Sequence, residues 1–402
     1  MTFVLPVSAA IVALVCFLVY RRLRLSHRGI RHESPSSPAV VEKASYDAIE
    51  PVPADFDWAT QPPLKIRPFK PKYHLSIGRR ARYAYKLLAL ETIDISNLIA
   101  MDNTYLDRIH IRRSVMDEHR EATLQCNDAA GPAVLELYEW MVTTYLPKRF
   151  PKVYKLMNTP TGLQLHNTVS DTYLPIQPAS PLAALESLGE HVDTDFLILL
   201  PSSTAADGSP IYHLQAFATM FPAGFSTKDK CGQPLATIHA PVPGYAAKLE
   251  RSMDRFFARI EVGRVVQRTN WSISTDDRLF SDGGNHMYGD VDQGKPIDTN
   301  NKTLAVDNLD LDEKIEHQKR DVVVDDCRLR CERQTLHRLP KTKALVFAFK
   351  TYLYRLEEVK EEGLGPVLAE AIEGLGKGSV PDMAFYKRGV VWGEKVMDYL
   401  NN

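Results

Sequence analysis

The residues best suited to chemistry fall in three polar clusters, each beside an apolar run: FPAGFSTKDKCGQPLATIHAPVPGY (221–245), VVQRTNWSI (265–273) and CRLRCERQTLHRLP (327–340). In the first cluster, His239 follows a short apolar stretch and precedes Pro-Val-Pro, which stiffens the backbone that carries it. A rigidly held imidazole is what an axial metal ligand requires. The alternative is a structural histidine in a hydrogen-bonded turn.

The third cluster is rich in arginine. It combines Glu332 with four arginines within eleven residues: Arg328, Arg330, Arg333 and Arg338. Guanidinium groups bind carboxylates and propionates well, so an anion-binding or catalytic role is one interpretation. The other is an Arg/Glu network that locks a loop against the protein. In either case we expect this run to form a polar rim at the start of the apolar strand that follows it.

The remaining candidates give weaker signals. Arg268 and Asn270 in the second cluster can bind polar groups, whereas Trp271 is more typical of a core. The Asp-x-Asp pairs at 193–195 and 290–292 resemble metal-binding or glycosyltransferase pairs, but short acidic pairs are common by chance.

The sequence around these residues predicts both strands and helices. Apolar or alternating runs at 195–201, 212–222 and 343–356 are typical of strands. Helical spacing indicates an amphipathic helix that opens after Pro132 and a second one over 245–260. We therefore expect an α+β fold with one antiparallel or mixed sheet and helices mainly on one face.

The N-terminal part predicts a membrane anchor. Residues 3–20 are eighteen residues without a charge, followed by Arg21 and Arg22. A cleaved signal peptide is the alternative, but the basic residues stand on the wrong side for it. The same asymmetry predicts a single-pass protein of the endoplasmic reticulum or another endomembrane, with the rest of the chain in the cytosol.

The remainder of the 402-residue chain divides by composition. We expect an anchor at 1–22, a flexible tether at 23–70, a domain at 71–358 with an acidic excursion at 275–325, and a helical tail at 359–402. The net charge of -1 provides no general basic field, which argues against nucleic acid as a partner.

Taken together, the three clusters resemble the successive motifs of the haem-dependent oxidative N-demethylase family, including its membrane-anchored fungal relatives. The segments RPFKPKYHLSIGRR (67–80) and MDNTYLDR (101–108) resemble the N-terminal motifs of that family. The resemblance covers residues 66–358. It implies a PAS-like α+β domain that binds haem b, activates O2 at the iron and oxidises an N-methyl group of a small amine, which is released as formaldehyde.

The resemblance also implies roles for particular residues. His239 is the preferred axial ligand of the iron, and His213 is the alternative. The R-x-E-R-Q run suggests catalytic, pocket-lining or propionate-binding roles for Arg330, Glu332, Arg333 and Gln334. The R-x-N-W motif suggests cofactor contacts for Arg268 and Asn270. Lys228 is expected to contact a propionate or an electron donor.

Nothing in the chain resembles a flavin or ferredoxin module, so electrons are expected from a separate flavin or iron–sulfur reductase. Two other functions stay open. One is a haem-binding sensor or carrier without turnover, because a fold does not fix a function. The other is a membrane-anchored glycosyltransferase that uses an Asp-x-Asp pair.

Overall fold

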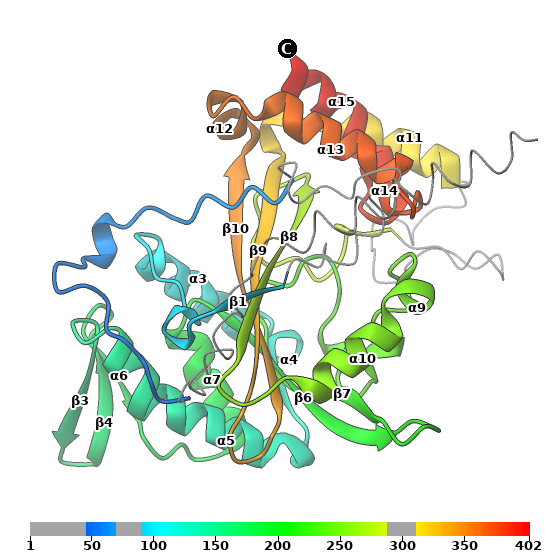
Figure 1. Ribbon diagram of the computed structural model, residues 1–402. Helices are drawn as coiled ribbons and strands as arrows, with labels where there is room; N and C mark the ends of the chain where they lie inside the picture. Colours follow the sequence, from blue (N-terminus) through cyan, green and yellow to red (C-terminus); the bar gives the residue numbers. More distant parts are fainter. Residues whose placement is uncertain (1–45, 70–89, 288–310) are drawn as a thin grey trace, which may run out of the picture. The chain divides into compact units, whose positions relative to one another are not determined.

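A seven-stranded antiparallel sheet forms the centre of the protein in the computed structural model, which describes residues 46–69, 90–287 and 311–402. Figure 1 shows its long strands running between groups of helices. The strand order is β1 (Glu91–Ile93), β8 (Val265–Ser274), β9 (Arg328–Arg338), β10 (Leu345–Arg355), β6 (Asp195–Thr204), β7 (Pro210–Ala218) and β2 (Leu124–Cys126). A small second sheet contains β3 (Tyr154–Thr159), β4 (Gly162–Asn167) and β5 (Thr172–Pro175).

The helices follow the local sequence signals. α7 begins where the Ser180 hydroxyl accepts a hydrogen bond from the Ala183 N–H at 3.1 Å, with Pro181 as the first helical residue. The helices are α3 (Tyr105–Glu118), α4 (Arg120–Thr123), α5 (Gly131–Trp140), α6 (Leu146–Arg149), α7 (Pro181–His191), α8 (Leu235–Ile238), α9 (Tyr245–Lys248), α10 (Glu250–Arg259), α11 (Leu311–Asp321), α12 (Leu356–Glu361), α13 (Gly365–Lys377), α14 (Met383–Tyr386) and α15 (Gly389–Asn401).

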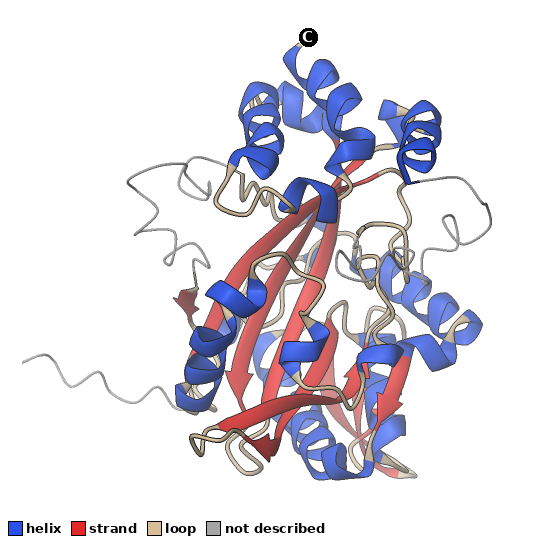
Figure 2. Cartoon of the chain, turned by 90° about the vertical axis from the view of Figure 1, so that its right-hand side faces the viewer, coloured by secondary structure: helices blue, strands red, loops and turns tan. Residues whose placement is uncertain are grey.

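One face of the large sheet is covered by α8 and α10, and we call it the α10 face. Its apolar residues form one buried cluster with both helices, including Leu199, Val266, Leu336 and Leu345 from the sheet and Phe257 from α10. The opposite face packs against α3, α5 and α7 in one half and against α13 and α15 in the other. Helices therefore cover both faces of the sheet (Figure 2), whereas we expected them mainly on one.

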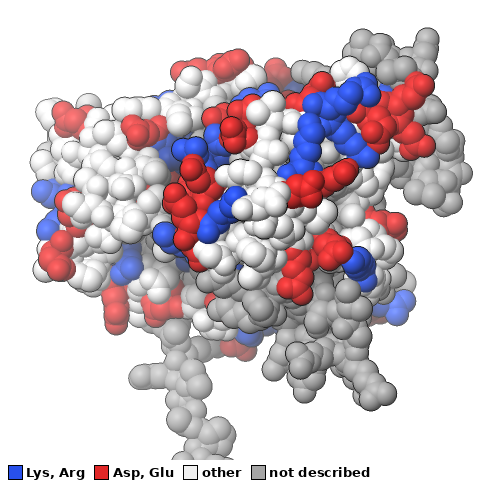
Figure 3. Space-filling view, turned by 90° about the horizontal axis from the view of Figure 1, so that it is seen from above, with Lys and Arg blue, Asp and Glu red and all other residues white. Residues whose placement is uncertain are grey.

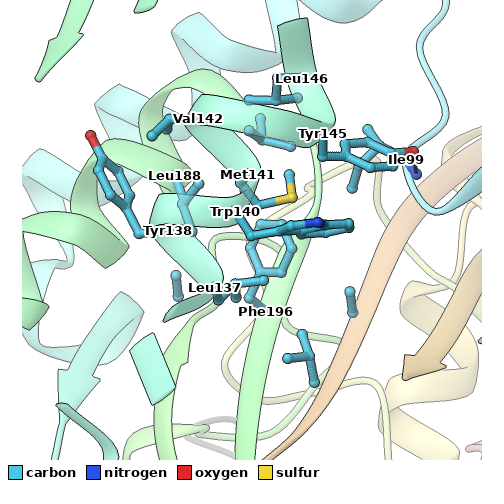
Figure 4. Packing of buried hydrophobic residues seen from close by; sticks show 14 of the residues in the cluster. Ile99, Leu137, Tyr138, Trp140, Met141, Val142, Tyr145, Leu146, Leu188 and Phe196 are labelled. Atoms are coloured by element: carbon cyan, nitrogen blue, oxygen red, sulfur yellow. Dashed lines mark hydrogen bonds between the residues drawn. The ribbon is translucent and has the colours of Figure 1, made fainter. Parts of the chain in front are cut away.

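The largest core cluster lies where α5 continues through a π-helical turn, Met141–Tyr145, onto the sheet. Figure 4 shows Trp140, Met141 and Tyr145 gathered near Phe196 of β6. The Tyr145 hydroxyl accepts a hydrogen bond from the Ile99 N–H at 3.0 Å, so this buried polar group is satisfied. The expected helix after Pro132 is present, and no sequence signal indicates the π-helical turn.

The expected transmembrane helix and single-pass membrane protein have to be corrected. No helix in the described ranges is long and apolar enough to cross a membrane, and residues 3–20 themselves lie outside those ranges. The fold class that the structure supports is α+β with antiparallel sheets. The five neighbouring strands β7, β6, β10, β9 and β8 form the body of the large sheet, and its likeness to a PAS sheet stays a prediction.

Two further segments differ from expectation. Residues 46–69 belong to the expected tether, yet Tyr46, Val52, Ile66 and Phe69 are buried in the cores of the domain. Residues 23–45 lie outside the described part. Of the expected acidic excursion, the stretch up to residue 287 is built into the fold, 288–310 is not described, and 311–321 forms α11.

Candidate haem site

Two of the three polar clusters form central strands of the sheet, including the run 327–340, which we expected to be a polar rim. The run CRLRCERQTLHRLP contains β9, and VVQRTNWSI lies within β8. Side chains alternate along a strand, so β9 sends Arg330, Glu332 and Gln334 to the α10 face and Cys331 and Arg333 to the other. The arginine-rich sequence therefore serves two different surfaces.

A row of four polar side chains crosses the α10 face, and we call it the polar row: Arg268, Asn270, Glu332 and Gln334. Arg268 pairs with Gln334 across β8 and β9, and Asn270 pairs with Glu332. Gln334 accepts a hydrogen bond from Nε of Arg268 and donates from Nε2 to Glu332 Oε2 at 2.6 Å. This chain holds the carboxylate in place beside the apolar cluster of the same face.

His239 ends α8, above this face. Its Nδ1 lies 2.8 Å from the Leu235 carbonyl oxygen, and its ring stacks on Tyr245 with centroids 4.8 Å apart. Because a carbonyl only accepts, Nδ1 carries the proton, and Nε2 keeps a lone pair that is bonded to no residue in the described ranges. Burial lowers the pKa of His239 to about 4, and the charges of Arg268 and Lys230 act in the same direction, so the ring is neutral at pH 7.

His213, the alternative ligand, is held differently. Its Nδ1 lies 3.0 Å from the Gly232 carbonyl oxygen, and its Nε2 lies 2.8 Å from the Ser203 hydroxyl. Nδ1 must donate to the carbonyl, so Nε2 accepts from Ser203 and both nitrogens are occupied. Of the two histidines, only His239 has a lone pair available for iron.

Arg330 is buried and tied to the backbone. Its terminal nitrogens donate to four carbonyl oxygens, those of Phe221, Pro222, Arg278 and Leu279, at 2.9 to 3.2 Å. Burial lowers its pKa to about 10. Most of its donors are therefore used to join two loops, and Nε is its only nitrogen with no hydrogen-bond partner among the described residues.

The structure separates two predicted residues from the polar row. Arg333 lies on the opposite face, where it donates to the carbonyls of Asn97 and Leu98. Lys228 is exposed and pairs with Glu121 at 2.6 Å, beside a surface cavity of about 470 Å³ that both residues line. Neither residue contacts the polar row, so we omit both from the site.

Sequence reasoning missed three residues near the polar row: His286, Tyr386 and Lys387. His286 is 6% exposed, and its ring centroid lies 4.6 Å from that of Tyr386. Burial lowers the pKa of Lys387 to about 8, and the charge of Glu332 opposes that shift. They come from a Gly/Asn-rich stretch and the C-terminal tail, where no motif marked them. A hydrogen bond from the Met287 N–H to the Tyr386 carbonyl, 2.9 Å long, brings the two segments together.

The turn Phe221–Phe225 explains how His286 is positioned. Gly224 has a φ of +89°, and a Cβ there would lie 2.5 Å from Asn285 Cβ and 2.8 Å from Asn285 N. The Gly224 N–H also donates to the Ser281 carbonyl at 2.7 Å. Only glycine allows both the backbone conformation and this close approach. The turn therefore fixes the loop that ends in His286.

The Asp-x-Asp pair at 193–195 is part of the scaffold. Asp193 pairs with Arg108 at 3.1 Å and with Lys350 at 3.1 Å, and Asp195 pairs with Arg112 at 2.7 Å. Both carboxylates are buried and neutralised by these cations, so they are not available to a nucleotide-bound metal. The second pair, 290–292, lies outside the described residues.

The donor set suits haem better than a free metal ion. Within the described ranges, no group of three or more His, Cys, Asp or Glu side chains could hold a metal ion. Haem needs only one or two protein ligands, because the porphyrin fills the other iron positions, and it needs an apolar surface. His239, whose Nε2 is bonded to no described residue, meets the first requirement, and the buried apolar cluster of the α10 face, which includes its neighbours Leu235 and Ile238, lies beside it.

A comparison with protein families agrees with this chemistry. The family model described as haem-dependent oxidative N-demethylase, alpha subunit-like, matches residues 89–397, which is more than half of the chain. The match includes β8, β9, α8 and the loop of His286. The chain therefore belongs to the family of haem-dependent oxidative N-demethylase alpha subunit-like proteins.

Proposed function

We propose that this protein uses haem b to oxidise an N-methyl group of a small amine with O2 and releases it as formaldehyde. The observation that carries the proposal is His239, a neutral imidazole with one nitrogen fixed by a backbone carbonyl and the other free. Iron-binding histidines typically donate their second N–H in this way. The family match supports the same function.

Two residues are assigned to hold the haem. Nε2 of His239 binds the iron, and Arg268 pairs with a propionate. Arg268 suits this role because its terminal nitrogens make no hydrogen bond to the described residues, whereas those of Arg330 are taken by carbonyls. Arg268 is also a fork-shaped donor, which matches a carboxylate in geometry.

Glu332 is assigned to bind the amine. Glu332 is 8% exposed, and Gln334 donates to one of its oxygens, so the other can accept a hydrogen bond from an ammonium group. Asn270 lies beside it on β8 and adds a polar group to the same surface. Gln334 is a positioning residue, because it links Glu332 to Arg268.

The haem, when bound, supplies reductive activation of O2. Overall, the N-methylated amine, O2, two electrons and two protons give the amine without its methyl group, formaldehyde and water. One oxygen atom enters the methyl group, whose C–N bond then breaks while the nitrogen takes up a proton, and the other oxygen leaves as water. We assign the electrons to a separate flavin or iron–sulfur reductase, because no segment of the sequence resembles such a module.

The test begins with haem binding by the full chain. After expression with added haem, the wild type and His213→Ala should show a Soret band, and His239→Ala should lose it. A pyridine haemochrome spectrum identifies haem b. An equal Soret band in His239→Ala would exclude it as the ligand, and the absence of haem from the wild type would exclude the proposal.

The alternative of a haem sensor or carrier is separated by turnover. With a chemical or enzymatic electron donor, O2 and a small N-methylated amine, the enzyme should release formaldehyde in proportion to the amine consumed. Glu332→Gln should raise KM for the amine while it keeps the haem. Haem binding without formaldehyde from any of a panel of N-methylated amines would favour the sensor or carrier.

A further inference from the structure

His286 is a buried histidine with one unused ring nitrogen. Its Nδ1 is buried and has no hydrogen-bond partner among the described residues. The backbone of Ala223 bonds to the ring and favours its protonated form, which identifies a carbonyl acceptor. The proton therefore lies on the other nitrogen, Nε2, and Nδ1 keeps its lone pair. A buried acceptor without a partner costs free energy, and it indicates a place for a ligand only where an unused donor lies on the same part of the fold.

Arg330 supplies the complementary group. Its Nε–H is buried and has no partner in the described part of the chain, whereas Nη1 and Nη2 both donate to carbonyl oxygens. Arg330 donates to the carbonyls of Phe221 and Pro222, and His286 follows Asn285, which packs on Gly224 of the same turn, so both side chains are anchored at this turn. One unused donor and one unused acceptor are the pair that a small polar molecule would satisfy.

The surroundings of His286 select the charge of such a molecule. Burial lowers the pKa of His286 to about 3, and the charges of Lys387, Lys230 and Arg330 act in the same direction. The imidazole is therefore neutral, and Nδ1 can only accept a hydrogen bond. A cationic donor would be repelled by the three neighbouring cations, so a neutral N–H or O–H donor fits best.

The position of His286 is preorganised. Asn285 packs directly on the backbone of Gly224, and the Met287 N–H donates to the Tyr386 carbonyl. The rings of Tyr386 and Phe225 lie 4.6 and 6.2 Å from the imidazole, measured between centroids. A side chain held by contacts on both sides can orient a ligand without further ordering.

The geometry points to His286 as a ligand-binding residue of the haem site, whose Nδ1 accepts a hydrogen bond from a neutral N–H or O–H donor bound beside the haem. The Nε–H of Arg330 donates to the same molecule. This inference rests on the proposed haem function, but it adds a residue outside the arginine, glutamate and histidine motifs of the sequence. It also predicts that the site binds a ligand with an N–H group more tightly than a ligand of similar shape without one.

The experiment compares two probes of ferric haem in the full-length holoprotein, imidazole and 1-methylimidazole. Both bind iron through a ring nitrogen, and only imidazole has an N–H to donate. The Kd of each is measured from the shift of the Soret band. A neutral hydrogen bond is worth about 0.5–1.5 kcal/mol, so His286→Phe should reduce the preference for imidazole by about 2- to 12-fold.

The controls separate this inference from the proposed function. His337→Leu is the matched control, because His337 is also buried with unpartnered nitrogens and a pKa lowered to about 3, but lies on the opposite face. It should keep the preference of the wild type. His286→Gln keeps an acceptor and should keep part of it, and His286→Leu replaces His286→Phe if the latter does not fold.

The outcomes are distinct. A wild type that binds no haem defeats the proposed function before this test begins. If the His286 variants without a nitrogen bind haem and discriminate the two probes as the wild type does, His286 does not bind the ligand. If His337→Leu loses the preference equally, the effect is a general consequence of core substitution, and the inference is wrong.

Discussion

Gly224→Ala should destabilise the protein and disturb the loop of His286. Gly224 has a φ of +89°, where an L-residue costs about 1–2 kcal/mol. In addition, the new Cβ would lie 2.5 to 2.9 Å from three atoms of Asn285, two of them backbone atoms. Such overpacking costs about 1–3 kcal/mol, so we expect a total loss of about 2–5 kcal/mol in the free energy of unfolding.

Gly208 offers a matched control. It has a similar φ of +81° in the turn between β6 and β7, and a Cβ there would have no heavy atom within 4 Å. Gly208→Ala should therefore cost only the conformational part, about 1–2 kcal/mol. The difference between the two variants isolates the contact between Gly224 and Asn285.

The assay is urea unfolding, in which equal m-values allow the midpoints to be compared directly. The Soret titration with imidazole then reports on the ligand side of the site. Gly224→Ala should weaken the preference for imidazole, and Gly208→Ala should not. If the two variants lose the same free energy of unfolding, the contact with Asn285 does not constrain the turn and the reasoning is refuted.

Three further predictions follow from buried charges and histidines. Asp195→Asn should lower the free energy of unfolding by about 3–5 kcal/mol in a urea titration, because Arg112 would lose its buried partner, whereas Lys228→Ala should leave it unchanged. Burial lowers the pKa of His337 from its usual 6.5 to about 3 in the folded protein. Between pH 6.5 and pH 3 the imidazole is therefore protonated in the unfolded state and neutral in the folded state, so the free energy of unfolding falls as the pH falls. In urea titrations from pH 7 to 4.5, the slope of the free energy of unfolding against pH should be smaller in His337→Leu than in the wild type, by up to about 1.4 kcal/mol per pH unit. An unchanged slope would show that His337 is not held neutral in the folded protein. Arg268→Leu should weaken haem retention in a transfer assay to apomyoglobin, while Arg333→Leu should affect stability alone.

Much of the sheet could be predicted because alternation is a local property. The run 343–356 alternates and forms β10, and the apolar run at 195–201 forms most of β6. β8 and β9 look like polar clusters in the sequence because three of the ten residues of β8 and six of the eleven residues of β9 are charged or carry an amide. A strand that presents a polar row to a ligand surface has no simple hydrophobic period, so its pattern resembles a rim.

The candidate site was predictable only where its residues share a segment. His239 stands out because its own neighbours, Leu235 and Pro241, make it rigid. His286 and Lys387 are brought close by the packing of residues about a hundred positions apart, which composition does not report. Arg333 is wrongly grouped with Glu332 and Gln334 because they are adjacent in the sequence. Adjacent residues of a strand face opposite sides of the sheet, so Arg333 lies away from the site.

The charged surface also bears on partners. In the view of Figure 3, Lys and Arg side chains are interspersed with Asp and Glu over the face formed by the C-terminal helices. Such a mixed surface does not resemble the continuous basic stripe of a nucleic-acid-binding protein. The reductase and the amine stay proposed partners, and the absence of nucleic acid stays a prediction.

The alternation of β9 has a practical consequence for directed evolution. A mutational library restricted to even-numbered positions of β8 and β9 and odd-numbered positions of β10 would vary the chemistry of the α10 face and leave the packing of the other face intact. A deletion of one residue within β9 would instead shift its register, so that the side chains beyond the deletion change faces. It would exchange the two surfaces at once and put Glu332 into the core, so evolution of this strand should proceed by substitution and not by changes in length.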